Sequence, residues 1–295
     1  MERPRRLHLH GPGRAGCSLA RMLDARGVAL IGASGGREEH LPEVRAALGE
    51  GVPWSPELPP LPAETLLLVG VPDDVLQQVL LDLPVERLPE REGLVMHLCG
   101  ARGLEVFPEA WPEDLVLAAF HPLRSFPTRT GPVEGGLGGC LVALETRREQ
   151  DLPLLEDLAR LVGGRPVRLP RGSRAGWHLG AAVLANGLVG LFDLALRVHG
   201  AVGVGEEDAR AGLATLAHQV LDNVERMGPE RALTGPVARG DVRVLSDHLR
   251  TLADVAARDE RFYEELLAML ARLAERGGRA EAARRVRALL ERGAS

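Results

Sequence analysis

The sequence predicts an α/β fold in which a doubly wound parallel sheet is followed by an all-helical C-terminal domain. A strand-like run at 5–10 leads into a glycine-rich turn and an apolar helix, and a second strand follows at 28–33. Later apolar runs lack alternation, which is typical of parallel strands covered on both faces. After Ser173 the strand signals give way to long helical patterns. We therefore expect domains at 1–171 and 172–295.

The elements are expected in the following order. The predicted strands are 5–10, 28–33, 65–71, 94–99, 115–120, 140–144 and 166–169. The predicted helices of the first domain are 19–23, 42–48, 75–80 and 152–161, with Asp73 or Asp74 as a cap of the third. The predicted helices of the second domain are 177–198, 206–226, 241–256, 260–275 and 280–292. The apolar stretch 179–192 predicts a buried helix, because it is shorter than the ~20 residues that span a bilayer.

The glycine-rich turn has the pattern G-x-G-x-x-G and lies between a predicted strand and a predicted helix. In a dinucleotide-binding turn the first glycine permits the tight turn, the second lets a pyrophosphate reach the backbone, and the third lets helix and strand pack closely. The same glycines also occur in plain strand-to-helix connectors, but the strand, helix and second strand around them favour a Rossmann-type site. The residues predicted to hold the cofactor here are Gly11, Pro12, Gly13, Arg14, Ala15 and Gly16.

The end of the second strand indicates which dinucleotide is bound. An acidic residue there would accept hydrogen bonds from the ribose 2′-hydroxyl of NAD, whereas this strand ends at Ser34 and is followed by Arg37. The guanidinium group offers a permanently charged fork to a 2′-phosphate. We expect NADP, with NAD as the alternative because Glu38 and Glu39 follow; a solvated arginine in an ordinary loop is the other interpretation.

Composition excludes several classes of function. A net charge of -5 and a pI near 6.0 argue against nucleic acid or an anionic membrane surface as the main partner. All 36 Lys+Arg residues are arginines, so Schiff-base chemistry and a lysine general acid are excluded. Cys17, Cys99 and Cys140 are far apart and form no C-x-x-C pair, which predicts a reducing, cytoplasmic location and no metal site.

Ligands of open α/β sheets bind beyond the carboxyl ends of the strands, so the residues after each strand are candidate ligands. Val71 and Pro72 follow one strand and are expected to contact the cofactor through the backbone. Gly100 follows the next and permits close approach of a ring or ribose. Cys99, beside it, is also expected to contact the cofactor, although a buried packing thiol is the commoner role of such a residue.

His121 follows a third strand and precedes a proline. An imidazole held there can hydrogen-bond a carbonyl or donate a proton near neutral pH, with Ser125 as an orienting or substrate-binding neighbour. The alternative is a histidine that satisfies loop carbonyls.

The helical domain supplies further candidates. His178 and Asn186 lie eight residues apart on one predicted helix, roughly on one face. Asn186 is expected to hold substrate, or else to bond a neighbouring helix. Thr234 and Arg239 lie in a glycine-containing link and are expected to bind a carboxylate. Asp241 is a candidate ligand whose favoured role is to cap the helix that it starts.

These residues together resemble a known group. The turn at 11–16, the segment 121–126, His178, Asn186 and the segment 233–241 resemble Rossmann-like oxidoreductases of unassigned function that carry a helical C-terminal domain. The resemblance covers nearly the whole chain, and the segment 233–241 is its most specific part. The group looks like a branch of the set containing pyrroline-5-carboxylate reductase, ketopantoate reductase and the β-hydroxyacid dehydrogenases.

The resemblance implies nicotinamide-dependent reduction at a cleft between the domains and homodimers joined through the helices. β-Hydroxyacid dehydrogenases place a catalytic lysine four residues before a helical asparagine, where this chain has Ala182. We therefore expect hydride transfer between NADPH and a small carboxylated ketone or imine, with His121 or His178 as proton donor. The alternative is a non-catalytic dinucleotide-binding sensor or regulatory protein.

Overall fold

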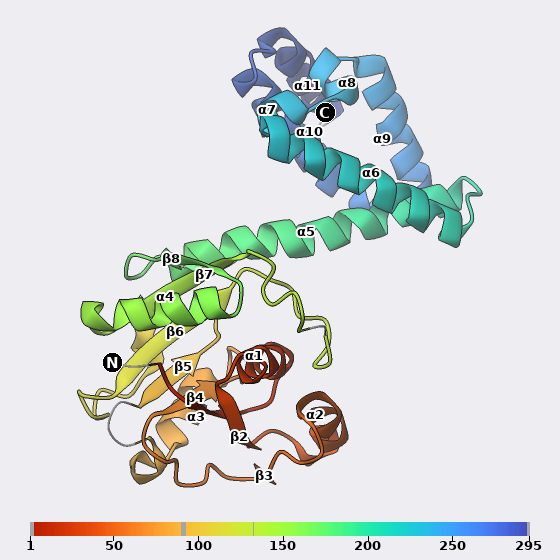
Figure 1. Ribbon diagram of the computed structural model, residues 1–295. Helices are drawn as coiled ribbons and strands as arrows, with labels where there is room; N and C mark the ends of the chain where they lie inside the picture. The colour runs from red at the N-terminus through yellow and green to blue at the C-terminus, as the bar shows by residue number, and fades with distance from the viewer. Residues whose placement is uncertain (1–2, 90–92, 132, 294–295) are drawn as a thin grey trace. The chain divides into compact units, whose positions relative to one another are not determined.

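The computed structural model describes residues 3–89, 93–131 and 133–293, and the chain divides into two compact units, 1–185 and 186–295. The first unit contains one eight-stranded sheet with the order β3-β2-β1-β4-β5-β6-β7-β8 (Figure 1). Every neighbouring pair is parallel except β6 and β7, which are antiparallel. The strands are β1 (Arg6–His10), β2 (Ala29–Ser34), β3 (Trp54–Ser55), β4 (Thr65–Val69), β5 (Leu94–His97), β6 (Val116–Pro122), β7 (Leu141–Thr146) and β8 (Arg165–Arg168).

The central strands are buried because helices cover both faces of the sheet. All residues of β4 and β5 are buried, as their unbroken apolar sequence predicted. α1 (Arg14–Asp24), α2 (Leu41–Leu48) and α4 (Leu152–Leu161) contribute to the core on one face, and α3 (Leu76–Asp82) contributes to the core on the other. The doubly wound α/β fold expected from the sequence is therefore confirmed.

The predicted strands agree with the structure within a few residues. The predicted acidic cap of α3 is wrong, because that helix begins after Val75 and no side chain caps it. Asp73 and Asp74 instead lie in a turn that ends before the helix starts. Single-turn 3-10 helices occur at Glu38–His40, Val85–Arg87, Leu104–Val106, Glu149–Asp151 and Ala257–Asp259.

Helices make up the rest of the chain. The five long helices predicted after Ser173 are present, and two short ones fill the link around 229–239. α8, α9, α10 and α11 share a small core that includes Val237, Leu245, Leu267 and Val286. The helices are α5 (Arg174–Ala201), α6 (Glu206–Met227), α7 (Pro229–Ala232), α8 (Gly235–Arg239), α9 (Val242–Ala256), α10 (Glu260–Arg276) and α11 (Ala280–Gly293). The division between the units falls within α5, whereas the sequence placed the boundary at 171–172.

The burial predicted for the apolar helix 179–192 is wrong for the single chain. Only Arg174 of α5 is buried, and Leu184 and Val189 are 63% and 70% exposed. The helix is also longer than the apolar stretch suggested. Among the described residues it is the one helix whose length and mean hydropathy of 1.8 over 18 residues would allow it to cross a membrane.

Candidate functional site

The turn between β1 and α1 is shaped by its glycines. Gly11 has a φ of 70°, and its N–H donates to the Ser34 carbonyl at 2.8 Å. A Cβ on Gly13 would lie 2.5 Å from the carbonyl oxygen of Gly70, the residue that follows β4. A Cβ on Gly16 would lie 3.2 Å from the Cα of Gly70. The turn therefore packs backbone against backbone at the carboxyl ends of β1 and β4.

The N-terminus of α1 is open to an anion. No side chain caps this helix, and its first turn contains no acidic residue. The backbone N–H groups of the first turn carry the positive end of the helix dipole. A cradle of glycine backbone that leads into an uncapped helix fits a dinucleotide pyrophosphate, because the anion can approach the backbone N–H groups closely.

A pocket of about 240 Å³ lies beside this turn. It brings together six of the residues predicted to hold the cofactor, namely Gly11, Pro12, Gly13, Arg37, Val71 and Pro72. The other residues that line it are Gly35, Gly36, His40, Leu41, Val44, Trp54, Gly70 and Arg129. No carboxylate is among these described residues, whereas two arginines are. Arg14, Ala15, Gly16, Ser34, Cys99 and Gly100, which were also predicted, do not line this pocket.

The Ser34 side chain is turned away from the pocket. It is fully buried, and its hydroxyl oxygen lies 2.8 Å from His8 Nε2 and 2.9 Å from His10 Nδ1. A hydroxyl has one proton, so it donates to at most one of these rings and accepts from the other. Burial lowers the pKa of both histidines to about 4, with His10 lowering that of His8 further. Because the hydroxyl is engaged inside the fold, we do not retain Ser34 as a phosphate ligand.

The loop after β6 supplies a cation to the pocket that the sequence did not reveal. Arg129 Nε donates to the Pro12 carbonyl at 3.1 Å, and its terminal nitrogen forms an ion pair with Glu43 of α2. Arg21 and Arg14 of α1 also hold this loop, through the carbonyls of Gly131 (2.6 Å) and Pro127 (3.4 Å). These contacts join segments over 80 residues apart, so local sequence carries no signal for them.

A second group of polar residues gathers at the ends of β5 and β6. The rings of His121 and His178 lie edge to face with centroids 6.1 Å apart, and a Cβ on Gly100 would lie 2.6 Å from His121 Nε2. The structure therefore brings together three residues that were predicted from separate parts of the sequence. Because residue 100 is a glycine, no side chain fills the space beside His121 Nε2.

Trp177 orients His121, and Ser125 does not. The indole Nε1–H donates to His121 Nδ1 at 2.9 Å. The orienting role expected of Ser125 is wrong, since its side chain is exposed and bonds no histidine of the described chain. Because the indole can only donate, it fixes Nδ1 as an acceptor and leaves the ring proton on Nε2.

His121 is neutral in this setting. Burial, then the charge of Arg174, then His178, lower the pKa of His121 to about 4. The ring is thus a poor source of a proton at neutral pH. It is instead a neutral donor whose Nε2–H faces Gly100.

The first residue of α5 is held at the same edge of the sheet. Arg174 is 2% exposed, and its Nε forms an ion pair with Glu145 Oε2 of β7 at 3.0 Å. Cys99 accepts from Arg174 through its carbonyl oxygen at 3.3 Å. Burial and the neighbouring Asp73 raise the pKa of the Cys99 thiol to about 12, which fits the packing role.

The candidates of the second unit lie at exposed positions or at a helix start. Asn186 and Thr234 are exposed, although Asn186 lies within the stretch 179–192 that was expected to be buried. Arg239 is exposed at the end of α8. Asp241 accepts from the Val244 N–H at 3.5 Å, which confirms its predicted role as the cap of α9.

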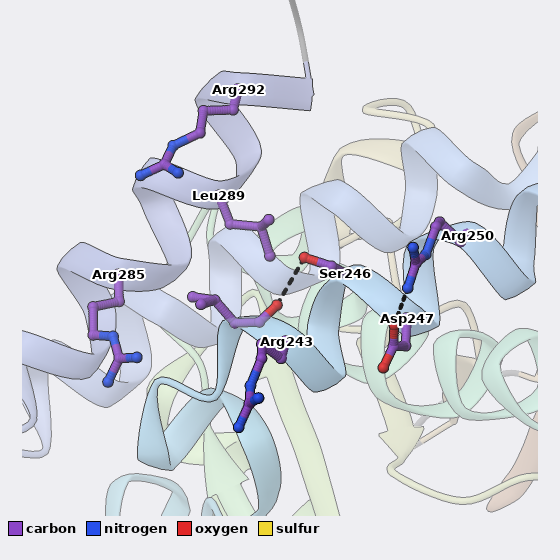
Figure 2. Close-up of a pocket in the computed structure, with 8 residues that line it drawn as sticks. Arg243, Ser246, Asp247, Arg250, Arg285, Leu289 and Arg292 are labelled. Atoms are coloured by element: carbon purple, nitrogen blue, oxygen red, sulfur yellow. Dashed lines mark hydrogen bonds and ion pairs between the residues drawn. The ribbon is translucent and has the colours of Figure 1, made fainter.

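The second unit has a pocket of its own, about 410 Å³ in volume, between α9 and α11 (Figure 2). Arg243, Arg285 and Arg292 border it, and Arg250 there is paired with Asp247. Ser246, also in this pocket, donates to the Val242 carbonyl at 2.8 Å. Thr234 and Arg239 are not among the residues that line it.

Comparison with known proteins supports the same architecture. Residues 140–270 match one family, Domain of unknown function (DUF2520). Protein TM1727 from Thermotoga maritima has a similar structure, with a TM-score of 0.71 and 22% identity over 91% of this chain and 99% of that one. The fold is that of these solved structures, a Rossmann-like sheet followed by a helical C-terminal region.

Other solved structures extend the comparison. A candidate NADP oxidoreductase from Bacteroides fragilis has a TM-score of 0.71 and 22% identity, over 89% of this chain and 96% of that one. The pyrroline carboxylate reductase of Plasmodium falciparum, solved with NADP bound, has a TM-score of 0.55 and 12% identity over 96% and 98% of the two chains. No curated protein matches the sequence. At these identities the similarity shows the fold alone.

Proposed function

We propose that this chain is an NADP-dependent oxidoreductase that acts on a small carboxylated ketone or imine. One observation carries the proposal: the pocket beside the glycine turn is lined by Arg37 and Arg129 and, among the described residues, by no carboxylate. Two guanidinium groups favour a ribose 2′-phosphate, and an acidic residue that would favour the free 2′-hydroxyl is missing from the lining. Related folds include proteins described with NADP or as oxidoreductases, which supports the same conclusion.

We assign the following roles to the residues. The turn at 11–16 would hold the pyrophosphate, and Arg37 and Arg129 the 2′-phosphate. When bound, NADPH supplies a hydride to the substrate. His121 Nε2–H donates a hydrogen bond to the substrate oxygen or nitrogen as charge develops there, and Trp177 keeps that proton on Nε2. His178 stays the predicted proton donor, and Asn186, Thr234 and Arg239 stay predicted substrate ligands.

Calorimetric titration with NADPH and NADH tests the cofactor assignment. We expect NADPH to bind at least about tenfold more tightly, because a charge-assisted hydrogen bond contributes about 1.5–3 kcal/mol. Arg37→Ala should weaken NADPH binding about tenfold and leave NADH binding unchanged, since the ion pair of Arg37 within the described residues is with the exposed Glu39 at 3.3 Å. Arg45→Ala, on the exposed side of α2, is the matched control. Equal affinities for the two nucleotides in the wild type would contradict the NADP assignment.

A turnover screen separates an enzyme from a sensor. NADPH oxidation should be measured with ketopantoate, pyrroline carboxylates and related keto acids as substrates. We expect at least one to be reduced, and His121→Ala to lower that turnover by about tenfold or more. Tight NADPH binding without turnover on any of them would favour the regulatory alternative.

We also propose that the protein is a cytoplasmic homodimer joined through α5 and α6. Both helices carry exposed apolar side chains, and exposed apolar surface often marks an interface between proteins. These side chains are Leu179, Val183, Leu184, Leu188, Val189 and Leu191 on α5, and Leu216, Val220, Leu221 and Val224 on α6. The free thiols of Cys17, Cys99 and Cys140 suit a reducing compartment.

Sedimentation of the purified protein tests the dimer. The wild type is expected to sediment as a dimer without detergent, and Leu184→Asp as a monomer, because a charge would be buried in the interface. Leu81→Asp, at an exposed apolar residue of α3, should leave the dimer intact. A wild-type monomer, or a protein recovered only with membranes, would contradict the proposal.

A further inference from the structure

Arg174 is a buried cation with an unusual number of partners. Besides the ion pair with Glu145, its terminal nitrogens donate to the carbonyls of Cys99 (3.3 Å), Ala119 (2.7 Å) and Ala143 (3.3 Å). These acceptors come from the loop just after β5, from β6 and from β7. One side chain at the start of α5 thus bonds two neighbouring strands and the loop that follows a third.

Stability alone does not explain such a pair. Both side chains are almost fully buried, at 3% and 8% exposure, so both charges lose their hydration. The attraction between them commonly does little more than offset that loss, and apolar residues of similar volume are often as stable or more so. What the pair does provide is a fixed position and direction for the first turn of α5.

That first turn carries the residues that define the histidine site. Trp177 and His178 lie three and four residues after Arg174, on the same face of the helix. Arg174 bonds the carbonyl of Ala119, two residues before His121 in β6, and Trp177 bonds His121 itself. Arg174 is therefore linked to both partners of the Trp177–His121 hydrogen bond. It lies on the same helix turn as Trp177, and it bonds the strand that carries His121.

We propose that Arg174, held by Glu145, is a positioning residue that aligns Trp177 on His121 and so keeps the His121 proton on Nε2, facing Gly100. Lysine is a poor substitute, because one ammonium group cannot match the directions of the planar fork. The alignment of Trp177 on His121 does not require NADP to bind. Only the effect of this alignment on catalysis rests on the proposed function.

Nitrogen NMR of histidine rings measures the tautomer directly. The protein is labelled with ¹⁵N-histidine, and the His121 signals are assigned by their loss in His121→Gln. We expect the wild type at pH 7 to show His121 as the Nε2–H tautomer alone. Trp177→Phe should give a mixture of both tautomers, because it removes the donor to Nδ1 and keeps an aromatic ring.

The decisive variant is the double substitution Arg174→Met/Glu145→Gln. It removes both charges together, so neither side chain is left as a buried unpaired ion. It leaves Trp177 in the sequence, yet we expect the same mixture of tautomers as in Trp177→Phe. Arg174→Lys should give an intermediate result.

Arg148→Met is the matched control, since it breaks a partly buried Arg–Asp pair at the start of α4. That variant should keep the single tautomer. A double variant that is folded and still shows only the Nε2–H tautomer would overturn the proposal. If the protein instead fails to oxidise NADPH while these spectra change as expected, the proposed function falls and the positioning role stands.

Discussion

Gly13→Ala is expected to weaken NADPH binding by tenfold to a hundredfold. The new Cβ would lie 2.5 Å from the Gly70 carbonyl oxygen, which the Gly13 N–H also contacts as a donor at 3.2 Å. Backbone surrounds the position, so the methyl group is accommodated only if the turn moves away from β4. Overpacking of this kind costs about 1–3 kcal/mol, and each 1.4 kcal/mol is about tenfold in affinity. Calorimetric titration measures the loss.

Gly13 gives a clean test because its φ of -71° is ordinary for alanine. The expected loss therefore comes from the contact with Gly70, which displaces the turn, rather than from an unfavourable φ at Gly13. Gly51→Ala is the control, since a Cβ there meets nothing within 4 Å. A Gly13→Ala protein that binds NADPH within about twofold of the wild type would mean that the cradle does not hold the pyrophosphate.

The fold was predictable because its signals are local. Apolar runs without alternation marked β4 and β5, and the spacing of glycines marked the turn before α1. Asp241 was predictable as a cap for the same reason, since it depends on a hydrogen bond to Val244 only three residues away.

The site was only partly predictable because it depends on strand register and long-range contacts. Ser34 was predicted as a phosphate ligand, yet the pairing of β1 with β2 sets its hydroxyl against His8 and His10. The alternation in β1, with both histidines opposite the buried Leu7 and Leu9, was the available signal. Trp177 bonds His121 from 56 residues away, a pairing that no local pattern encodes.

The apolar helix α5 shows a different limit. An apolar run predicts that a helix is buried, but it does not identify the surface that packs against the helix. Leu184 and Val189 are exposed in the structure, and the homodimer proposed above is one way to cover them.

Acidification below pH 6.5 is expected to destabilise the sheet-containing unit steeply. Burial lowers the pKa of His8, His10 and His121 to about 4 and that of His97 to about 3. In the unfolded chain a histidine titrates near 6.5. Between pH 6.5 and pH 4 the unfolded chain therefore binds more protons than the folded one, and the free energy of unfolding falls as the pH falls.

The size of this effect follows from the number of groups. Each histidine contributes at most about 1.4 kcal/mol per pH unit, so the four together lower the free energy of unfolding by up to roughly 5 kcal/mol per unit. Urea unfolding at pH 7, 6 and 5, at one protein concentration, measures the slope. Above pH 6.5 these histidines should no longer make the free energy of unfolding depend on pH.

One substitution assigns part of the slope to a residue. His97 is fully buried, with Nε2 3.0 Å from the Gly103 carbonyl and Nδ1 accepting from the Cys99 N–H at 3.2 Å. A glutamine offers one donor and one acceptor without titrating, so His97→Gln should reduce the slope by up to about 1.4 kcal/mol per pH unit. His40→Gln, at a partly exposed histidine of the same unit, is the control. A free energy of unfolding that stays constant from pH 6.5 to pH 5 would show that these histidines are not held neutral by the fold.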